Sequence, residues 1–82
     1  MKVLQFCDAK NQFIIRDNEG NEYLQSYDSI IVKWDRNGKI SLGRNWNYSV
    51  TTGKYRNRYL CETKRETEAK IKSGAYTMDY TL

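Results

Sequence analysis

Apolar and polar residues alternate in short runs over the first half of the chain, and turn-forming residues separate the runs. Alternation with a period of two is typical of β-strands. The runs predict five strands, at about residues 2–7, 13–17, 21–27, 29–35 and 39–43. Because only short turns join these runs, the pattern predicts an antiparallel meander in which consecutive strands are neighbours.

Three of the predicted turns have one form. In Asp35–Lys39 the first residue suits the start of a type I turn, and Gly38 stands where φ must be positive. Asp17–Asn21 has the same form, and Asp8–Gln12 has Asn11 in place of glycine. A three-residue loop at each turn brings apolar residues of neighbouring strands together. We therefore expect these pairs: Trp34 with Ile40, Val32 with Leu42, Ile15 with Tyr23, Ile14 with Leu24, Arg16 with Glu22, Cys7 with Phe13, and Phe6 with Ile14.

The first three strands carry apolar side chains on both faces. One face holds Leu4, Phe6, Ile14 and Leu24, and the other holds Val3, Cys7, Phe13, Ile15 and Tyr23. A sheet with one face in water does not need apolar residues on both sides. The sheet is therefore expected to be either strongly curled or covered on both faces.

The second half of the chain predicts helices and a closing strand. Thr63 and Glu66 have the spacing of a capping box, and the helix they begin is expected over about residues 64–73, before Gly74. An earlier short helix is expected to begin at Thr51 or Thr52 as its N-cap and to run through about residue 60. Residues 75–82 alternate cleanly and predict a last strand, which pairs either within the chain or across a homodimer.

These elements define the predicted fold. It is an α+β domain spanning residues 1–82, with a curled antiparallel meander of five to six strands and one or two short helices between the penultimate and last strands. No apolar run has the length of a membrane span, and the first ten residues do not resemble a signal peptide. We expect a cytoplasmic protein in which Cys7 and Cys61 are buried free thiols.

Charge is distributed unevenly along the chain. Residues 1–41 contain six basic and six acidic side chains, whereas residues 42–82 contain eight basic and four acidic. Residues 44–60 contain four basic and four aromatic side chains and no acid. This mixture is typical of surfaces that meet phosphates or acidic side chains. The candidate binding residues are Arg44, Trp46, Tyr48, Lys54, Arg56 and Arg58, while Tyr55, Tyr59 and Leu60 are expected to pack on the sheet.

The sequence offers little for catalysis. It has no histidine, so no obvious base activates the neighbouring hydroxyls of Ser49, Thr51 and Thr52. The aspartates stand at turns and strand ends, where binding turn amides is their ordinary role. Spacings typical of metal ligands and of phosphate-binding glycine loops are absent. We therefore expect a non-enzymatic protein that uses no metal or cofactor.

Three segments resemble a family of small proteins encoded by phages and prophages of low-GC bacteria. They are YLQSYDSIIVK (23–33), WNYSVTTGKYRNRYL (46–60) and T-x-x-E-T-x-x-K-I-x-S-G-x-Y (63–76). The shared pattern is W-x-Y-S-x-T-T-x-K-Y-x-x-x-[FY]-L, here from Trp46 to Leu60. The family often has Asp where this chain has Asn47, either as a turn acceptor, which Asn can replace, or as a charge needed for function.

The resemblance implies a context but no activity. Small phage accessory proteins commonly bind and inhibit a host nuclease or a CRISPR effector. The leading hypothesis is therefore an anti-CRISPR or other anti-defence inhibitor, whose partner is a host protein or nucleoprotein complex. The alternative is a basic protein that binds DNA or RNA directly. A small enzyme, using Lys54 or a threonine, is the third hypothesis.

Overall fold

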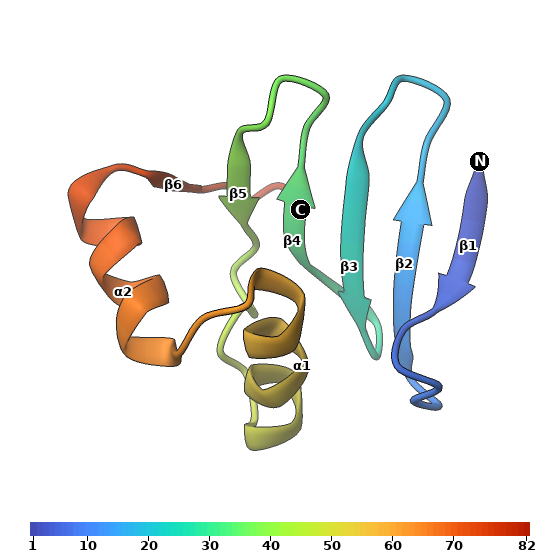
Figure 1. Cartoon of the computed structure of the whole chain (residues 1–82), viewed down its shortest axis with the longest axis horizontal. Helices are drawn as coiled ribbons and strands as arrows, with labels where there is room; N and C mark the ends of the chain where they lie inside the picture. The colour runs from blue at the N-terminus through green and yellow to red at the C-terminus, as the bar shows by residue number, and fades with distance from the viewer.

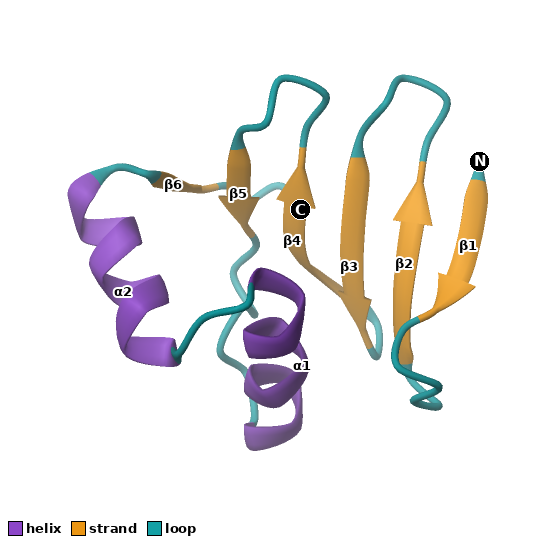
Figure 2. Cartoon of the chain, in the orientation of Figure 1, coloured by secondary structure: helices purple, strands orange, loops and turns teal.

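The computed structural model describes all 82 residues and contains a single six-stranded sheet with two helices. The strands lie side by side in chain order (Figures 1 and 2). In the sequence, the two helices come between the fifth and sixth strands, which nevertheless pair with each other. The first four strand pairs are antiparallel, and only the last pair is parallel. The α+β meander is thus confirmed. Its elements are β1 (Lys2–Gln5), β2 (Gln12–Arg16), β3 (Glu22–Ser26), β4 (Ser29–Trp34), β5 (Ile40–Leu42), α1 (Val50–Leu60), α2 (Lys64–Ser73) and β6 (Tyr76–Met78).

Turn chemistry sets the register of two hairpins as predicted. The Asp35 carboxylate accepts hydrogen bonds from the backbone N–H groups of Asn37 and Lys39, both at 2.9 Å, and Gly38 has φ of 84°. Trp34 consequently pairs with Ile40 across the β4–β5 hairpin. The equivalent turn at Asp17–Asn21 gives the expected pairs Ile14 with Leu24, Ile15 with Tyr23, and Arg16 with Glu22.

The register predicted for the first hairpin is wrong by two residues. Ile14 pairs with Leu4, and Phe6 lies beyond the end of β1. The reason is tertiary packing: the Phe6 ring contacts Tyr55 and Tyr59 of α1 edge-to-face, with centroid distances of 6.3 and 5.9 Å. A slip of two residues leaves each β1 side chain on its predicted face.

Both cysteines are exposed free thiols, so their predicted burial is wrong. Cys7 lies in the β1–β2 loop with φ of 55°, next to Asp8 with the same φ. Cys61 ends α1 in the left-handed conformation, with φ of 57°. Both cysteines lie in turns. At a turn the chain changes direction, so apolar residues that are adjacent in the sequence do not bury the thiol. Proximity to apolar residues in the sequence was therefore a poor guide to burial here.

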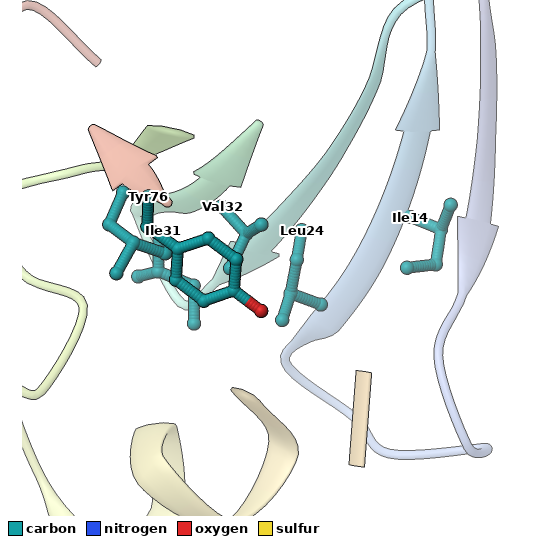
Figure 3. Close-up of a cluster of buried hydrophobic side chains, with 6 residues drawn as sticks. Ile14, Leu24, Ile31, Val32 and Tyr76 are labelled. Carbon is teal, nitrogen blue, oxygen red and sulfur yellow. The ribbon is translucent and has the colours of Figure 1, made fainter. Parts of the chain in front are cut away.

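The core lies between the helices and one face of the sheet. It consists of Ile14, Leu24, Ile31, Val32, Leu42 and Tyr76 (Figure 3). A register shift between β3 and β4 at Leu24 and Gln25 leaves Ile31 without a cross-strand partner. This bulge lets the consecutive residues Ile31 and Val32 both enter the core, each with no exposed surface.

The opposite face of the sheet has no helix packed against it. Val3, Ile15 and Tyr23 form one row across β1, β2 and β3, and Phe13 lies beside them. Val3 is 56% exposed and the other three are half-buried. The side-chain hydrogen bonds from α1 to the sheet, at Glu22 and Ser26, lie on the Leu24 side. The helices therefore cover only one face of the sheet, so the expectation that both faces are covered is wrong.

The last strand is shorter than predicted and pairs within the chain. β6 covers only Tyr76–Met78 and runs parallel to β5, with Leu42 opposite Met78. The chain then turns, with the Asp79 carboxylate accepting a hydrogen bond from the Thr81 N–H at 2.9 Å. The alternation in residues 79–82 is therefore that of a turn and not of a strand. Neither helix combines the length and the apolar character that a membrane span requires.

The Asp17 turn makes stability depend on acid pH. The Asn21 side chain is the main cause that lowers the pKa of Asp17 to about 2, with further hydrogen bonds from the Asn21 and Glu19 amides and the Tyr23 hydroxyl. A carboxyl group whose pKa is lower in the folded state stabilises the fold above its unfolded pKa. This contribution is lost as the pH falls from about 4 to about 2.

We therefore expect the urea midpoint of unfolding to fall over this pH range, and to fall less steeply for Asp17→Asn. Circular dichroism at each pH measures the midpoint. Asp28→Asn is the control, because the Asp28 side chain makes no hydrogen bond. An Asp17→Asn profile as steep as that of the wild type would assign the acid sensitivity to other carboxyl groups.

Candidate functional site on helix α1

Helix α1 begins earlier than the sequence predicted. Ser49 is the N-cap, and its hydroxyl oxygen accepts a hydrogen bond from the Thr52 N–H at 3.1 Å. Thr52 cannot serve as the cap because its side chain is buried against the sheet, where its hydroxyl lies 3.0 Å from the Ser26 hydroxyl. This contact joins the first turn of α1 to the end of β3.

Arg56 is a buried residue and not part of an exposed patch, so its predicted placement is wrong. Only 1% of its surface is exposed. Its Nη1 donates to the Trp46 carbonyl oxygen at 2.9 Å and to Asn47 Oδ1 at 3.2 Å, and its Nη2 donates to Asn57 Oδ1 at 2.8 Å. The guanidinium carbon also lies 5.0 Å from the centre of the Trp46 ring. Arg56 thereby fastens the segment before α1 to the helix.

The partners of Arg56 are all neutral. No carboxylate pairs with it, and Nε has no hydrogen-bond partner. Burial lowers the pKa of Arg56, while the more distant charges of Glu62 and Glu68 oppose that change. Asn47 Oδ1 supplies one of the acceptors to this guanidinium. The Asn47 side chain is an acceptor, as one of the two roles considered for this position requires, but its donor is the Arg56 guanidinium and not a turn amide.

Lys54 and Arg58 form the exposed cationic part of the predicted site. Both are exposed, and neither belongs to an ion pair. The Lys54 ammonium and the Arg58 guanidinium each lie 5.5 Å from the centre of the Tyr55 ring. Tyr55 is half-buried, and its ring is held from beneath by Phe6. We call Lys54, Tyr55 and Arg58 the α1 cationic face.

The other predicted residues lie elsewhere. Arg44 is exposed and donates a hydrogen bond to the Tyr80 carbonyl oxygen at 3.4 Å, near the C-terminus. Trp46 is half-buried and packs against the core. Tyr48 is 76% exposed and borders a separate hollow. The six-residue site predicted from the sequence is therefore divided among several locations.

Two hollows lie on either side of the N-terminus of α1. The first, of about 600 Å³, separates the β3–β4 turn from the segment before the helix, and we call it the aromatic hollow. It is lined by Ser26, Tyr27, Asp28, Ser29, Ile31, Asn45, Tyr48, Ser49, Thr51 and Thr52. The second, of about 750 Å³, is the basic hollow, lined by Asn47, Ser49, Val50, Gly53, Lys54, Arg56, Asn57 and Lys64. Ser49 borders both.

A buried carboxylate network was not predicted from the sequence. Glu62 accepts hydrogen bonds from Thr67 Oγ1 at 2.6 Å, from Lys70 Nζ at 2.7 Å and from the Tyr76 hydroxyl at 2.7 Å. Burial alone would raise the pKa of Glu62, but these bonds, led by that of Lys70, lower it. The network joins the α1–α2 connection to β6. Its only signal in the sequence was that Glu62 is the first acid after the acid-free stretch.

No group of three or more cysteine, aspartate or glutamate side chains is placed to hold a metal ion, and the chain has no histidine. The fold and site define a small α+β protein whose sheet is covered by helices on one face and whose first helix displays unpaired cations. Residues 1–75 match the family described as "Family of unknown function (DUF8033)", and the chain belongs to that family. Comparisons with curated proteins and with solved structures found no match.

Proposed function

We propose that this is a non-enzymatic binding protein that inhibits a host defence or nucleic-acid-processing complex, such as a CRISPR effector. In this proposal the α1 cationic face contacts an acidic protein surface in the cytoplasm of the host bacterium. One observation carries the proposal: Lys54 and Arg58 are exposed without a carboxylate partner and both lie against the Tyr55 ring.

The composition of this face supports a protein partner. Tyrosine and arginine are enriched among the residues that dominate binding energy at interfaces. The contacts with Tyr55 restrict two long side chains before binding, which reduces the entropy lost on association. The resemblance to phage accessory proteins favours an inhibitor as the biological role, by association only.

The test reverses both charges. Lys54→Glu with Arg58→Glu is expected to weaken partner binding by about 100-fold, because like charges across an interface cost several kcal/mol. In a host with active CRISPR immunity, the wild-type protein should restore phage plaques and the double variant should not. Lys10→Glu with Arg65→Glu makes the same charge change at two exposed positions outside any ion pair and should behave as the wild type.

Two results would contradict the proposal. One is unimpaired immunity in hosts that express the wild-type protein, tested against several defence types, together with no stoichiometric partner in a pull-down. The other is full inhibition by the Lys54→Glu, Arg58→Glu variant, which would place the contact elsewhere on the molecule. Circular dichroism establishes that each variant is folded.

Direct binding to DNA or RNA is the second candidate, favoured by the absence of acid from Arg44 to Leu60. It requires a gel shift with DNA or RNA at low salt and an affinity that falls with salt according to the number of phosphates contacted. The same double variant would abolish that shift. A host complex captured without nucleic acid, and retained at high salt, would favour the protein partner instead.

A further inference from the structure

The aromatic hollow has two exposed tyrosines at its border and an apolar residue within it. Tyr27 is 46% exposed and Tyr48 is 76% exposed, whereas Ile31 has no exposed surface. Exposed aromatic rings beside a hollow provide surfaces on which a flat ring can stack. The volume of about 600 Å³ falls within the range of small-molecule sites.

The backbone at Tyr27 is strained, and two hydrogen bonds keep it in this conformation. Its φ is 54°, a conformation that is rare for an aromatic residue and costs about 1 kcal/mol or more. The Tyr27 N–H donates to the Asn11 carbonyl oxygen at 2.8 Å, and Gln25 Nε2 donates to the Tyr27 carbonyl oxygen at 2.7 Å. A glycine or asparagine would occupy this turn without strain. The turn itself therefore gives no reason for a tyrosine at this position, and we attribute its presence to a role of the side chain.

The polar groups of the aromatic hollow can recognise both donors and acceptors. The hydroxyls of Ser26, Thr52 and Ser49 form a chain, with oxygen separations of 3.0 and 3.2 Å. A hydroxyl can donate or accept, and the Asp28 carboxylate, which makes no hydrogen bond in the protein, can accept. The edge of a nucleobase carries both kinds of group.

The basic hollow begins where the aromatic hollow ends, at Ser49. It contains the Lys54 and Lys64 side chains, and no acidic residue lines it. Arg56, of whose surface 1% is exposed, also lines it and adds a positive charge that no carboxylate contacts. The first turn of α1 contains no acid, so the positive end of the helix is not neutralised locally. A buried arginine without an ion pair favours an anionic ligand in contact with its surroundings.

We infer that the two hollows together form a nucleotide site, with the base between Tyr27 and Tyr48 and the phosphate beside Lys54 and Lys64. A ligand with one aromatic end and one anionic end matches the order of the hollows across Ser49. The ligand is either a free mononucleotide or one nucleotide of a single strand, since both present the same base and phosphate. The site is separate from Arg58, which lines neither hollow.

Calorimetric titration of the full-length protein with AMP and with UMP tests this inference. At least one of the two is expected to bind about tenfold or more tightly than adenosine or uridine, inorganic phosphate or ribose 5-phosphate, because the nucleotide fills both hollows. Tyr48→Ala is expected to weaken nucleotide binding by about 10-fold or more, given the usual contribution of base stacking. Lys64→Ala should weaken the nucleotide but not the nucleoside.

The variants separate this inference from the proposed function. Tyr48→Ala should weaken nucleotide binding and retain inhibition of the host complex, whereas Arg58→Glu should retain nucleotide binding. A single-stranded oligonucleotide that binds more tightly than its mononucleotide identifies a strand as the source, and equal affinity identifies the free nucleotide. No heat with either nucleotide at millimolar concentration would overturn the inference. Equal binding of ribose 5-phosphate, or unchanged binding by Tyr48→Ala, would overturn it as well.

Discussion

Glu62→Ala is expected to reduce the free energy of unfolding by about 3 kcal/mol, because it removes the acceptor that the buried Thr67 and Tyr76 hydroxyls share. It also removes the ion-pair partner of Lys70, whose side chain is 45% exposed. The Glu62 side chain is only 3% exposed, and Lys70, Thr67 and Tyr76 all donate to it within 2.7 Å. Small domains have a net stability of about 5–15 kcal/mol, so this loss is a large fraction of the total.

Urea unfolding followed by circular dichroism measures the change. Glu68→Ala is the matched control: its ion pair with Lys64, at 3.6 Å, is exposed and is expected to contribute about 0.5 kcal/mol or less. Glu62→Gln should fall between the two, because the amide oxygen still accepts while the charge is lost. A Glu62→Ala protein as stable as Glu68→Ala would show that the network contributes nothing beyond a surface ion pair.

The parts of the fold that the sequence predicted are those governed by local chemistry. The turn at Asp35 and Gly38 sets its register through bonds within five residues, and the capping box of Thr63 and Glu66 is likewise local. Both are visible in the order of residues alone. The β4–β5 register and the bounds of α2 were predicted correctly for this reason.

The predictions that failed depend on contacts between distant segments. Phe6 leaves its strand because Tyr55 and Tyr59, about fifty residues away, offer it aromatic contacts. Helical spacing indicated on which side of α1 Arg56 lies, but not that the segment before the helix, at Trp46 and Asn47, covers it. Glu62 has partners on α2 and β6 that no short pattern connects. The sequence therefore predicted which residues belong to the candidate site. It did not predict that the fold places them at several separate locations.

Arg56→Ala is expected to destabilise the protein by about 3 kcal/mol, and Arg58→Ala by no more than about 0.5 kcal/mol. The two arginines stand two residues apart on one helix but differ completely in their surroundings. Truncation of Arg56 removes the donors to Trp46 and Asn47 and leaves a cavity beneath α1, whereas Arg58 loses only an exposed contact with Tyr55.

Asn47→Asp tests the same contact by strengthening it, where Arg56→Ala removes it. It gives the Arg56 guanidinium a carboxylate acceptor in place of an amide at 3.2 Å, which adds the attraction between opposite charges to the existing hydrogen bond. We expect a stability equal to or greater than that of the wild type, and no such effect when Arg56 is already alanine, because the gain requires both groups. If Arg56→Ala instead unfolds at the wild-type urea concentration and loses only partner binding, Arg56 belongs to the contact surface and not to the structure beneath it.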